Sequence, residues 1–239
     1  MAIYRPIKKI AIPIAALLIG LIIAFTMMPT KMDAIWNEWT GQTTKWEHNS
    51  YRITSAYMKD GVEASKETGI WSDELSHFKL MSQVSDDSTF TFDVYFEGEH
   101  LFIYSGEEWV QGTTGDRFVN EIAPLDHPFK WMRDMLAEAD IVEKQKTKNG
   151  VTYVAVFEQF DEIDFRGYSL EKQEHTTLSL TVAGDNLLME FNVIPIRPDH
   201  IGPFRGYPRE MSYTIRFEKT DKKAVPLPEE AYLSKSLDE

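Results

Sequence analysis

The six histidines are the first residues to examine for chemistry, because an imidazole can act as a base or bind a metal ion. They are His48, His77, His100, His127, His175 and His200. They are scattered along the chain, and none belongs to an HExxH motif. Glu99-His100 and Glu174-His175 are adjacent pairs, but neighbours on a strand point to opposite faces. We therefore expect no metal site.

Residues that could form a covalent intermediate or hold a phosphate follow no known motif either. The chain has no cysteine, no GxSxG motif and no glycine-rich phosphate loop or dinucleotide fingerprint. The acidic run 161–164 is typical of a solvated face. We expect a non-catalytic protein without a cofactor, and a hydrolase with an acid-based site is the least favoured alternative.

The most unusual polar segment is 194–209, with the sequence IPIRPDHIGPFRGYPR. Its four prolines stiffen it, and arginine and aromatic side chains suit partner recognition. A proline-rich crossover that protects a sheet edge is the alternative interpretation, and we favour it. If a partner binds here, the candidate residues are Arg197, His200, Phe204, Arg205 and Tyr207.

The charge of the chain restricts its partners. The net charge is −13, and three of the 25 basic residues but none of the 38 acidic ones lie in the first 30 residues, which leaves −16 for residues 31–239. Such a surface repels phosphate backbones, so we expect no nucleic-acid partner. Without cysteine there is no disulfide, which is compatible with a bacterial cell envelope of the Gram-positive type.

An apolar segment near the N-terminus predicts where the protein works. Ile10 to Met28 are nineteen residues without a charge, preceded by Arg5, Lys8 and Lys9. A helix of this length roughly spans a ~30 Å hydrocarbon core, and the basic flank places the N-terminus inside. We expect a cytoplasmic stub at 1–9, an uncleaved transmembrane signal anchor at 10–29 and an extracytoplasmic domain at 30–239. A cleaved signal and a buried soluble helix are the alternatives.

The rest of the chain mostly has the period of two that is typical of strands. Clear alternation occurs at 51–57, 78–83, 90–96 and 211–217, with hairpin signals at 60–61, 148–150 and 183–186. The run 161–174 is a charged connection that is either disordered or carries a short helix. These features predict one antiparallel domain.

Two segments have helical spacing instead. The stripe of Phe129, Met132, Met135 and Leu136 predicts a helix at 128–139 that packs on the sheet. Trp36 and Trp39 lie three apart, which predicts an earlier helix ending near Trp46. We expect Trp39 and Trp46 to pack on the sheet, and an aromatic belt at the membrane is the alternative.

This order of elements resembles the LolA/LppX-like lipoprotein-carrier family. The matching features are the first helix, the pair of strands that leads to Gly69-Ile70-Trp71, the lone helix at 128–139, and the hairpin YFEGEHLFIYS at 95–105 with Trp109 after it. The resemblance covers about residues 35–232. It implies a mainly antiparallel β (α+β) fold, a curved half-barrel sheet with one or two helices on its concave face. The lipid-anchoring cysteine of some members is absent.

The resemblance implies a membrane-tethered envelope protein that binds an apolar ligand, either a lipid or a lipidated protein, in the concave face. We predict nine lining residues and expect only part of them to face inward: Trp71, Leu80, Phe92, Tyr95, Phe102, Tyr104, Trp109, Met132 and Met135. The alternative is a non-catalytic sensor or adaptor with a fully packed core, which modulates a membrane protein through surface contacts.

Overall fold

The structure, a computed structural model, describes residues 30–85, 88–148, 150–158, 163–170, 173–202 and 206–237. The predicted cytoplasmic stub and transmembrane segment, residues 1–29, lie outside these ranges. Among the helices inside them, none has the length and hydropathy that a membrane crossing requires.

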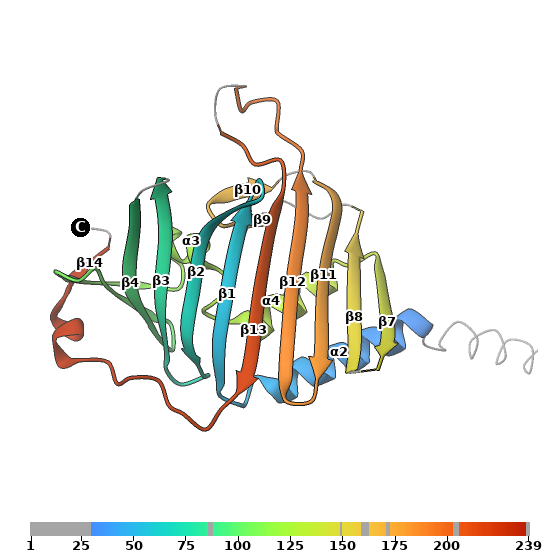
Figure 1. The fold of residues 1–239 in the computed structure, drawn as a ribbon, viewed down its shortest axis with the longest axis horizontal. Helices are drawn as coiled ribbons and strands as arrows, with labels where there is room; N and C mark the ends of the chain where they lie inside the picture. Colours follow the sequence, from blue (N-terminus) through green and yellow to red (C-terminus); the bar gives the residue numbers. More distant parts are fainter. Residues whose placement is uncertain are drawn as a thin grey trace, which may run out of the picture.

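One sheet of twelve strands dominates the molecule (Figure 1). Its strand order is β14-β6-β5-β4-β3-β2-β1-β13-β12-β11-β8-β7, and all neighbours are antiparallel except β14 and β6. The strands are β1 (Tyr51–Lys59), β2 (Val62–Trp71), β3 (Ser76–Ser85), β4 (Ser88–Glu97), β5 (His100–Tyr104), β6 (Trp109–Thr113), β7 (Ile141–Thr147), β8 (Gly150–Phe157), β11 (Gln173–Ala183), β12 (Asn186–Pro195), β13 (Met211–Lys219) and β14 (Lys235–Ser236). The predicted mainly antiparallel β fold is confirmed.

Helices cover one face of this sheet, which we call the helix face (Figure 1). They are α2 (Lys31–Trp46), α3 (Arg117–Ile122) and α4 (Pro128–Ala137), and the small hairpin of β9 (Ile163–Phe165) and β10 (Tyr168–Leu170) joins them. The stripe predicted on α4 is buried at Phe129, Met132, Met135 and Leu136. The opposite face of the sheet is called the outer face.

The first helix packs on the sheet, as the interpretation of its tryptophans predicted. Trp39 is fully buried, and its indole N–H lies 3.3 Å from the sulfur of Met132. Trp46 packs against the same core. Trp36 is half-buried and donates to the carbonyl of Leu136 at 3.0 Å. The two helices therefore contact each other through the side chains that also cover the sheet.

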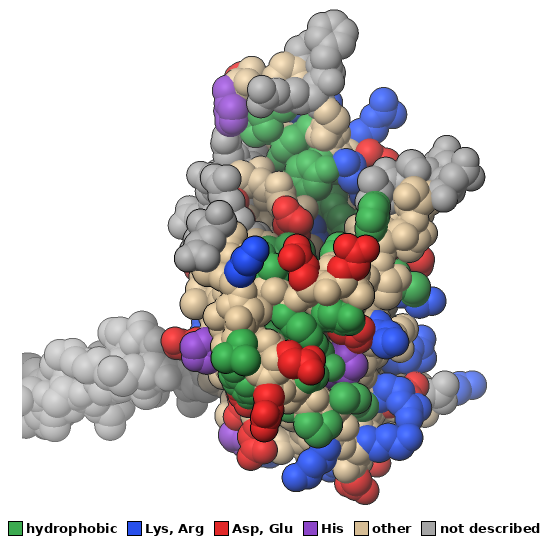
Figure 2. Space-filling model, turned by 90° about the vertical axis from the view of Figure 1, so that its left-hand side faces the viewer, with side chains coloured by type: hydrophobic (Ala, Val, Ile, Leu, Met, Phe, Trp, Pro, Cys, Tyr) green, Lys and Arg blue, Asp and Glu red, His purple; other side chains and the backbone are tan. Residues whose placement is uncertain are grey.

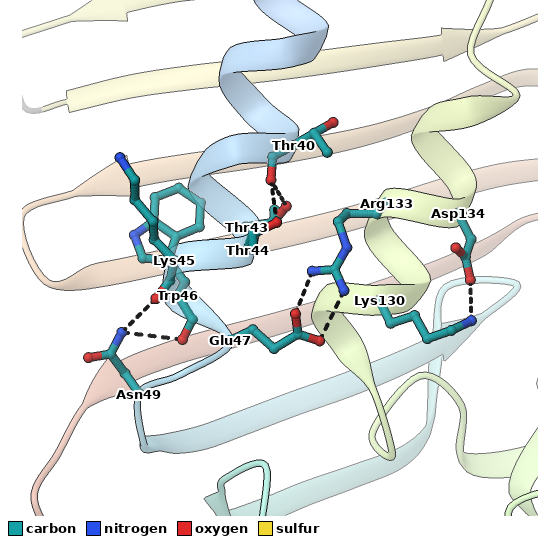
Figure 3. A network of polar contacts seen from close by, with 10 residues as sticks. All are labelled: Thr40, Thr43, Thr44, Lys45, Trp46, Glu47, Asn49, Lys130, Arg133 and Asp134. Carbon is teal, nitrogen blue, oxygen red and sulfur yellow. Dashed lines mark hydrogen bonds and ion pairs between the residues drawn. The ribbon is translucent and has the colours of Figure 1, made fainter.

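Ion pairs at the rim of the helices supplement this packing. The guanidinium of Arg133 on α4 contacts both carboxylate oxygens of Glu47, at 2.8 and 3.0 Å, just after the end of α2 (Figure 3). Glu38 accepts hydrogen bonds from Lys144 and Tyr153, which lower the pKa of this carboxyl. These contacts link α2 to α4 and to the edge of the sheet.

A fully buried ion pair ties the β9–β10 hairpin to the sheet. Arg166 stands in the turn of the hairpin with a φ of +51°, and its Nη1 lies 3.0 Å from Glu67 Oε1 on β2. Glu67 also accepts from the hydroxyls of Ser55, at 2.5 Å, and Ser65, at 2.7 Å. The guanidinium lies 4.2 Å from the ring centroid of Tyr213. The described part of the charged connection at 161–174 is therefore a hairpin and the start of β11, and not a helix.

The outer face carries a second, smaller apolar cluster. Tyr95 and Phe102 are buried there beneath Ala231 of the 3-10 helix η1 (Glu229–Leu233). The chain then continues into β14, which pairs with the edge strand β6. The C-terminal segment thus covers both an apolar patch and the edge of the sheet, which prevents edge-to-edge association.

Replacement by alanine should change the free energy of unfolding in opposite directions at two glycines. A Cβ on Gly69 would lie 2.0 Å from the carbonyl oxygen of His77 on β3, whereas a Cβ on Gly41 in α2 meets nothing within 4 Å. We expect Gly69→Ala to lower the free energy of unfolding by about 1–3 kcal/mol, and Gly41→Ala to raise it by about 0.5–1 kcal/mol. Urea unfolding of the full chain measures both, and equal effects would contradict the packing of β2 against β3.

Neutralising one partner of the buried ion pair should destabilise the protein far more than neutralising one partner of an exposed pair. In Glu67→Gln the buried guanidinium loses its counter-charge, and we expect unfolding to become easier by about 3–5 kcal/mol. The matched control is Glu47→Gln, which removes a partly exposed pair worth about 0–1 kcal/mol. Urea titrations followed by tryptophan fluorescence compare the two. Equal midpoints would show that Glu67 and Arg166 are not paired in the core.

Candidate functional site

An apolar groove opens on the helix face between strands β2, β3 and β4 and the short helix α3. Its volume is about 250 Å³. Eight residues line it: Ser65, Leu80, Ser82, Phe90, Phe92, Phe118, Glu121 and Ile122. The side of the molecule where β4 lies has a hollow floored by hydrophobic side chains, with acidic side chains along its lower rim (Figure 2). We take this groove as the candidate binding site.

Pairing of the strands places the floor of the groove in two rows. Glu67, Leu80 and Phe92 occupy one row across β2, β3 and β4. Ser65, Ser82 and Phe90 occupy the next row, nearer the β3–β4 turn. Because side chains two residues apart on a strand share a face, both rows point to the helix face.

Exposure gives the groove a direction. Leu80 and Ile122 form its closed end, with 5% and 2% of their surfaces exposed, whereas Phe90 is 53% exposed. Phe92 and Phe118 are half-buried between them, and Glu121 is exposed. An apolar floor thus leads to a mouth formed by an aromatic ring and a carboxylate.

The buried ion pair lies directly behind the groove. Ser65, a lining residue, donates to Glu67, and Arg166 Nη1 lies 3.3 Å from the same hydroxyl. That Nη1 also donates to the backbone carbonyl of Glu121 on α3, at 3.1 Å. Arg166 therefore binds the floor and the wall of the groove at once and fixes the distance between them.

Five of the nine predicted lining residues lie on the helix face, and two of them line the groove. Leu80 and Phe92 are part of its floor. Trp71, Met132 and Met135 are buried in the packed core, where the indole N–H of Trp71 donates to the carbonyl of Asp126 at 3.2 Å. They support the sheet and helices and do not reach the groove.

The other four predicted lining residues lie on the outer face, which corrects their predicted place. Tyr95, Phe102 and Trp109 belong to the cluster beneath the C-terminal segment. Tyr104 stacks on Trp109 with the ring centroids 5.0 Å apart. Their position follows from alternation, since Tyr95 is the neighbour of the inward-facing Val94 and Phe96.

Six of the eight groove residues are absent from the predicted set, and three of these six are apolar: Phe90, Phe118 and Ile122. Phe90 lies two residues before Phe92 and therefore on the same face of β4, so the alternation of this strand could have identified it. Phe118 and Ile122 lie on α3, a helix of six residues that was not predicted. So short a segment has too few residues for a helical period to be recognised.

The predicted partner residues at 194–209 are only partly described. Arg197 and His200 are exposed. Tyr207 is 7% exposed and packs on Tyr168, and its hydroxyl donates to the carbonyl of Ser169 at 3.1 Å. Phe204 and Arg205 lie outside the described residues. Tyr207 thus fixes the segment to the β9–β10 hairpin, and Arg197 and His200 stay as predicted contact residues.

A larger cleft of about 510 Å³ lies elsewhere, and seven of its ten lining residues have polar or charged side chains. It is lined by His48, Asn49, Ser50, Ser72, Asp73, Glu74, Leu75, Lys223, Ala224 and Pro226. The His77 ring contacts Asp93 at 2.7 Å on the outer face, and neither residue is among those that line the two spaces. Within the described ranges, no three His, Asp or Glu side chains gather closely enough to hold a metal ion. The groove is therefore the site that best suits an apolar ligand.

Comparisons with known proteins concern the fold alone. No family model matches the sequence, and no curated protein matches it. Among solved structures the chain is similar to LprF from Mycobacterium bovis, with 7% identity, a TM-score of 0.47, and coverage of 82% of this chain and 95% of that one. It is also similar to the LolA superfamily protein NE2245 from Nitrosomonas europaea, with 9% identity, a TM-score of 0.29, and coverage of 83% and 96%. These likenesses assign the chain neither a family nor a ligand or activity.

Proposed function

We propose that this chain is a membrane-tethered, extracytoplasmic protein that binds an apolar ligand, a lipid or the acyl chain of a lipidated protein, in the groove on the helix face. The observation that carries the proposal is the exposed Phe90, which continues into the closed apolar end at Leu80 and Ile122. A large exposed apolar side chain that leads into an apolar recess is typical of a ligand site. The tether rests on the uncharged segment 10–29, and the helix face is the concave face of the proposed half-barrel.

The size of the groove restricts the ligand. Pockets for drug-sized molecules hold about 300–1,000 Å³, and this one holds about 250 Å³. One short apolar chain fits such a space, whereas the two chains of a phospholipid do not. The proposed ligand therefore inserts a single chain, and any further part of it stays outside the mouth.

The role that follows is retention or presentation at one membrane rather than transport between two. A chain anchored by residues 10–29 stays at the membrane in which it is inserted. The Arg166 contacts hold α3 against the floor, so the groove is formed before a ligand arrives. No reaction is required of the protein in this role.

A second candidate function is that of an adaptor that contacts a membrane protein through its surface. The crossover between β12 and β13 stands out beyond the end of the sheet (Figure 1). Ile194 near the end of β12 and Ile196 at the start of the crossover are 39% and 40% exposed, and Arg197 beside them is exposed as well. If this candidate function holds, Arg197→Ala should abolish crosslinking to one membrane protein in cells, and Arg216→Ala on β13 should not. Unchanged crosslinking in Arg197→Ala would exclude it.

Filling the groove should weaken ligand capture. The full chain, held in phosphatidylcholine nanodiscs, is exposed to an alkyl maltoside that carries a photoreactive diazirine in its chain. Ser82→Trp places an indole in the groove, which leaves room for about two fewer methylenes of the probe's alkyl chain. Because each buried methylene contributes about 0.8 kcal/mol, we expect labelling of the groove to fall by about tenfold. Mass spectrometry of the digested protein measures the labelling.

The matched control for that substitution is Met81→Trp. Met81 is the neighbour of Ser82, faces outward and is 39% exposed, so its replacement leaves the groove open. Phe90→Ser is a second variant, and the fold should tolerate it because Phe90 is exposed. We expect the probe to label the groove of this variant several-fold less than that of the wild type. Equal labelling of wild type, Ser82→Trp and Phe90→Ser would exclude the groove as the site.

A further inference from the structure

We infer that the groove takes a single alkyl chain whose head group is an ammonium cation. This inference rests on the proposed function and adds the chemistry of the ligand's polar end. It depends on three features of the described residues: the direction of the groove, the composition of its mouth, and the way in which Arg166 is already engaged.

The exposure gradient decides which end of an amphiphile lies where. The closed end, at Leu80 and Ile122, offers no polar side chain to a ligand. An alkyl chain there removes apolar surface from water, which is favourable by about 25 cal/mol per Å². The head group therefore stays at the mouth, beside Phe90 and Glu121.

The mouth combines aromatic rings with one carboxylate. Phe90, Phe92 and Phe118 line the groove, and Glu121 is its only charged lining residue among those that the structure describes. The face of a phenyl ring attracts a cation within about 6 Å of its centroid, and aromatic rings are the usual partners of quaternary ammonium groups. A carboxylate beside them favours the same charge.

Among the lining residues that the structure describes, none supplies a counter-charge for an anionic head group at this mouth. Arg166 is the cation behind the floor, but its side chain is 1% exposed, and its Nη1 contacts Glu67, Ser65 and the carbonyl of Glu121. Its charge is compensated by Glu67 and is separated from the groove by the Ser65 hydroxyl. The net charge of −16 on residues 31–239 opposes an anion as well.

Three probes of equal chain length test the inference. Each has the same diazirine-bearing alkyl chain and carries a trimethylammonium, a maltoside or a sulfate head group. The full chain in phosphatidylcholine nanodiscs is labelled at low ionic strength, and labelled peptides are quantified. For each probe we divide the labelling of the groove in the wild type by the labelling in Glu121→Gln. This ratio cancels the partitioning of the probe into the lipid.

We expect that ratio to be about 2–5 for the ammonium probe, as for a partly exposed charge pair with an aromatic contribution. It should be 1 for the maltoside and below 1 for the sulfate. The matched control is Glu143→Gln, an exposed glutamate on β7 at the far end of the sheet, which should leave all three ratios at 1. Added salt should reduce the ammonium ratio toward 1.

The outcomes separate the two proposals. If the maltoside labels the groove of the wild type but Glu121→Gln changes ammonium and sulfate labelling equally, the ammonium preference is wrong and the apolar site stands. If none of the three probes labels the groove, the proposed function fails and the inference fails with it. A ratio of wild type to Glu121→Gln that is larger for the sulfate probe than for the ammonium probe overturns the inference directly.

Discussion

The buried contact between Glu67 and Arg166 is the interaction on which the arrangement of the helix face depends. Two charges inside a protein are stable only when they are paired and hydrogen-bonded, and here Ser55 and Ser65 complete the shell of the carboxylate. The same guanidinium reaches α3 through the carbonyl of Glu121. One side chain thus joins the β9–β10 hairpin, the sheet and α3, and the groove is the space that this junction leaves open.

The sheet provides two faces with different tasks. Its helix face is packed over most of its width by α2, α4 and the hairpin, with Trp39, Phe129 and Met132 fully buried. The apolar patch on its outer face is covered by the C-terminal segment. The groove at β2–β4 is the part of the helix face where α3 is too short to cover the strands, which explains why Phe90 is left exposed.

Much of this fold could be predicted from the sequence, because period and turn chemistry are local. The alternation at 51–57 and 211–217, the hairpin signal at 183–186 and the stripe on α4 all have the predicted structure. The facing of β5 could not be fixed, since both parities of this strand are apolar, and on β4 the aromatic Tyr95 stands in the otherwise polar parity. Tyr95 and Phe102 are large aromatic residues beside Phe96 and Ile103, but they pack under the C-terminal segment, more than 120 residues later in the chain.

The site was harder to predict than the fold for the same reason. Glu67 and Arg166 are 99 residues apart, and each stands among other charged residues that are exposed. Nothing local distinguishes a buried charge from its solvated neighbours, because burial is decided by the pairing of distant strands. Leu80 and Phe92 could be proposed from alternation, whereas the wall of the groove required the tertiary position of α3.

Native mass spectrometry of the full chain, extracted from cell membranes under mild conditions, tests the central claim most directly. If the groove holds one apolar chain, the protein should carry a mass excess that organic solvent releases as a single-chain amphiphile, at one molecule per protein. The claim would be contradicted if the protein is extracted without any mass excess and gains none after incubation with membrane lipids.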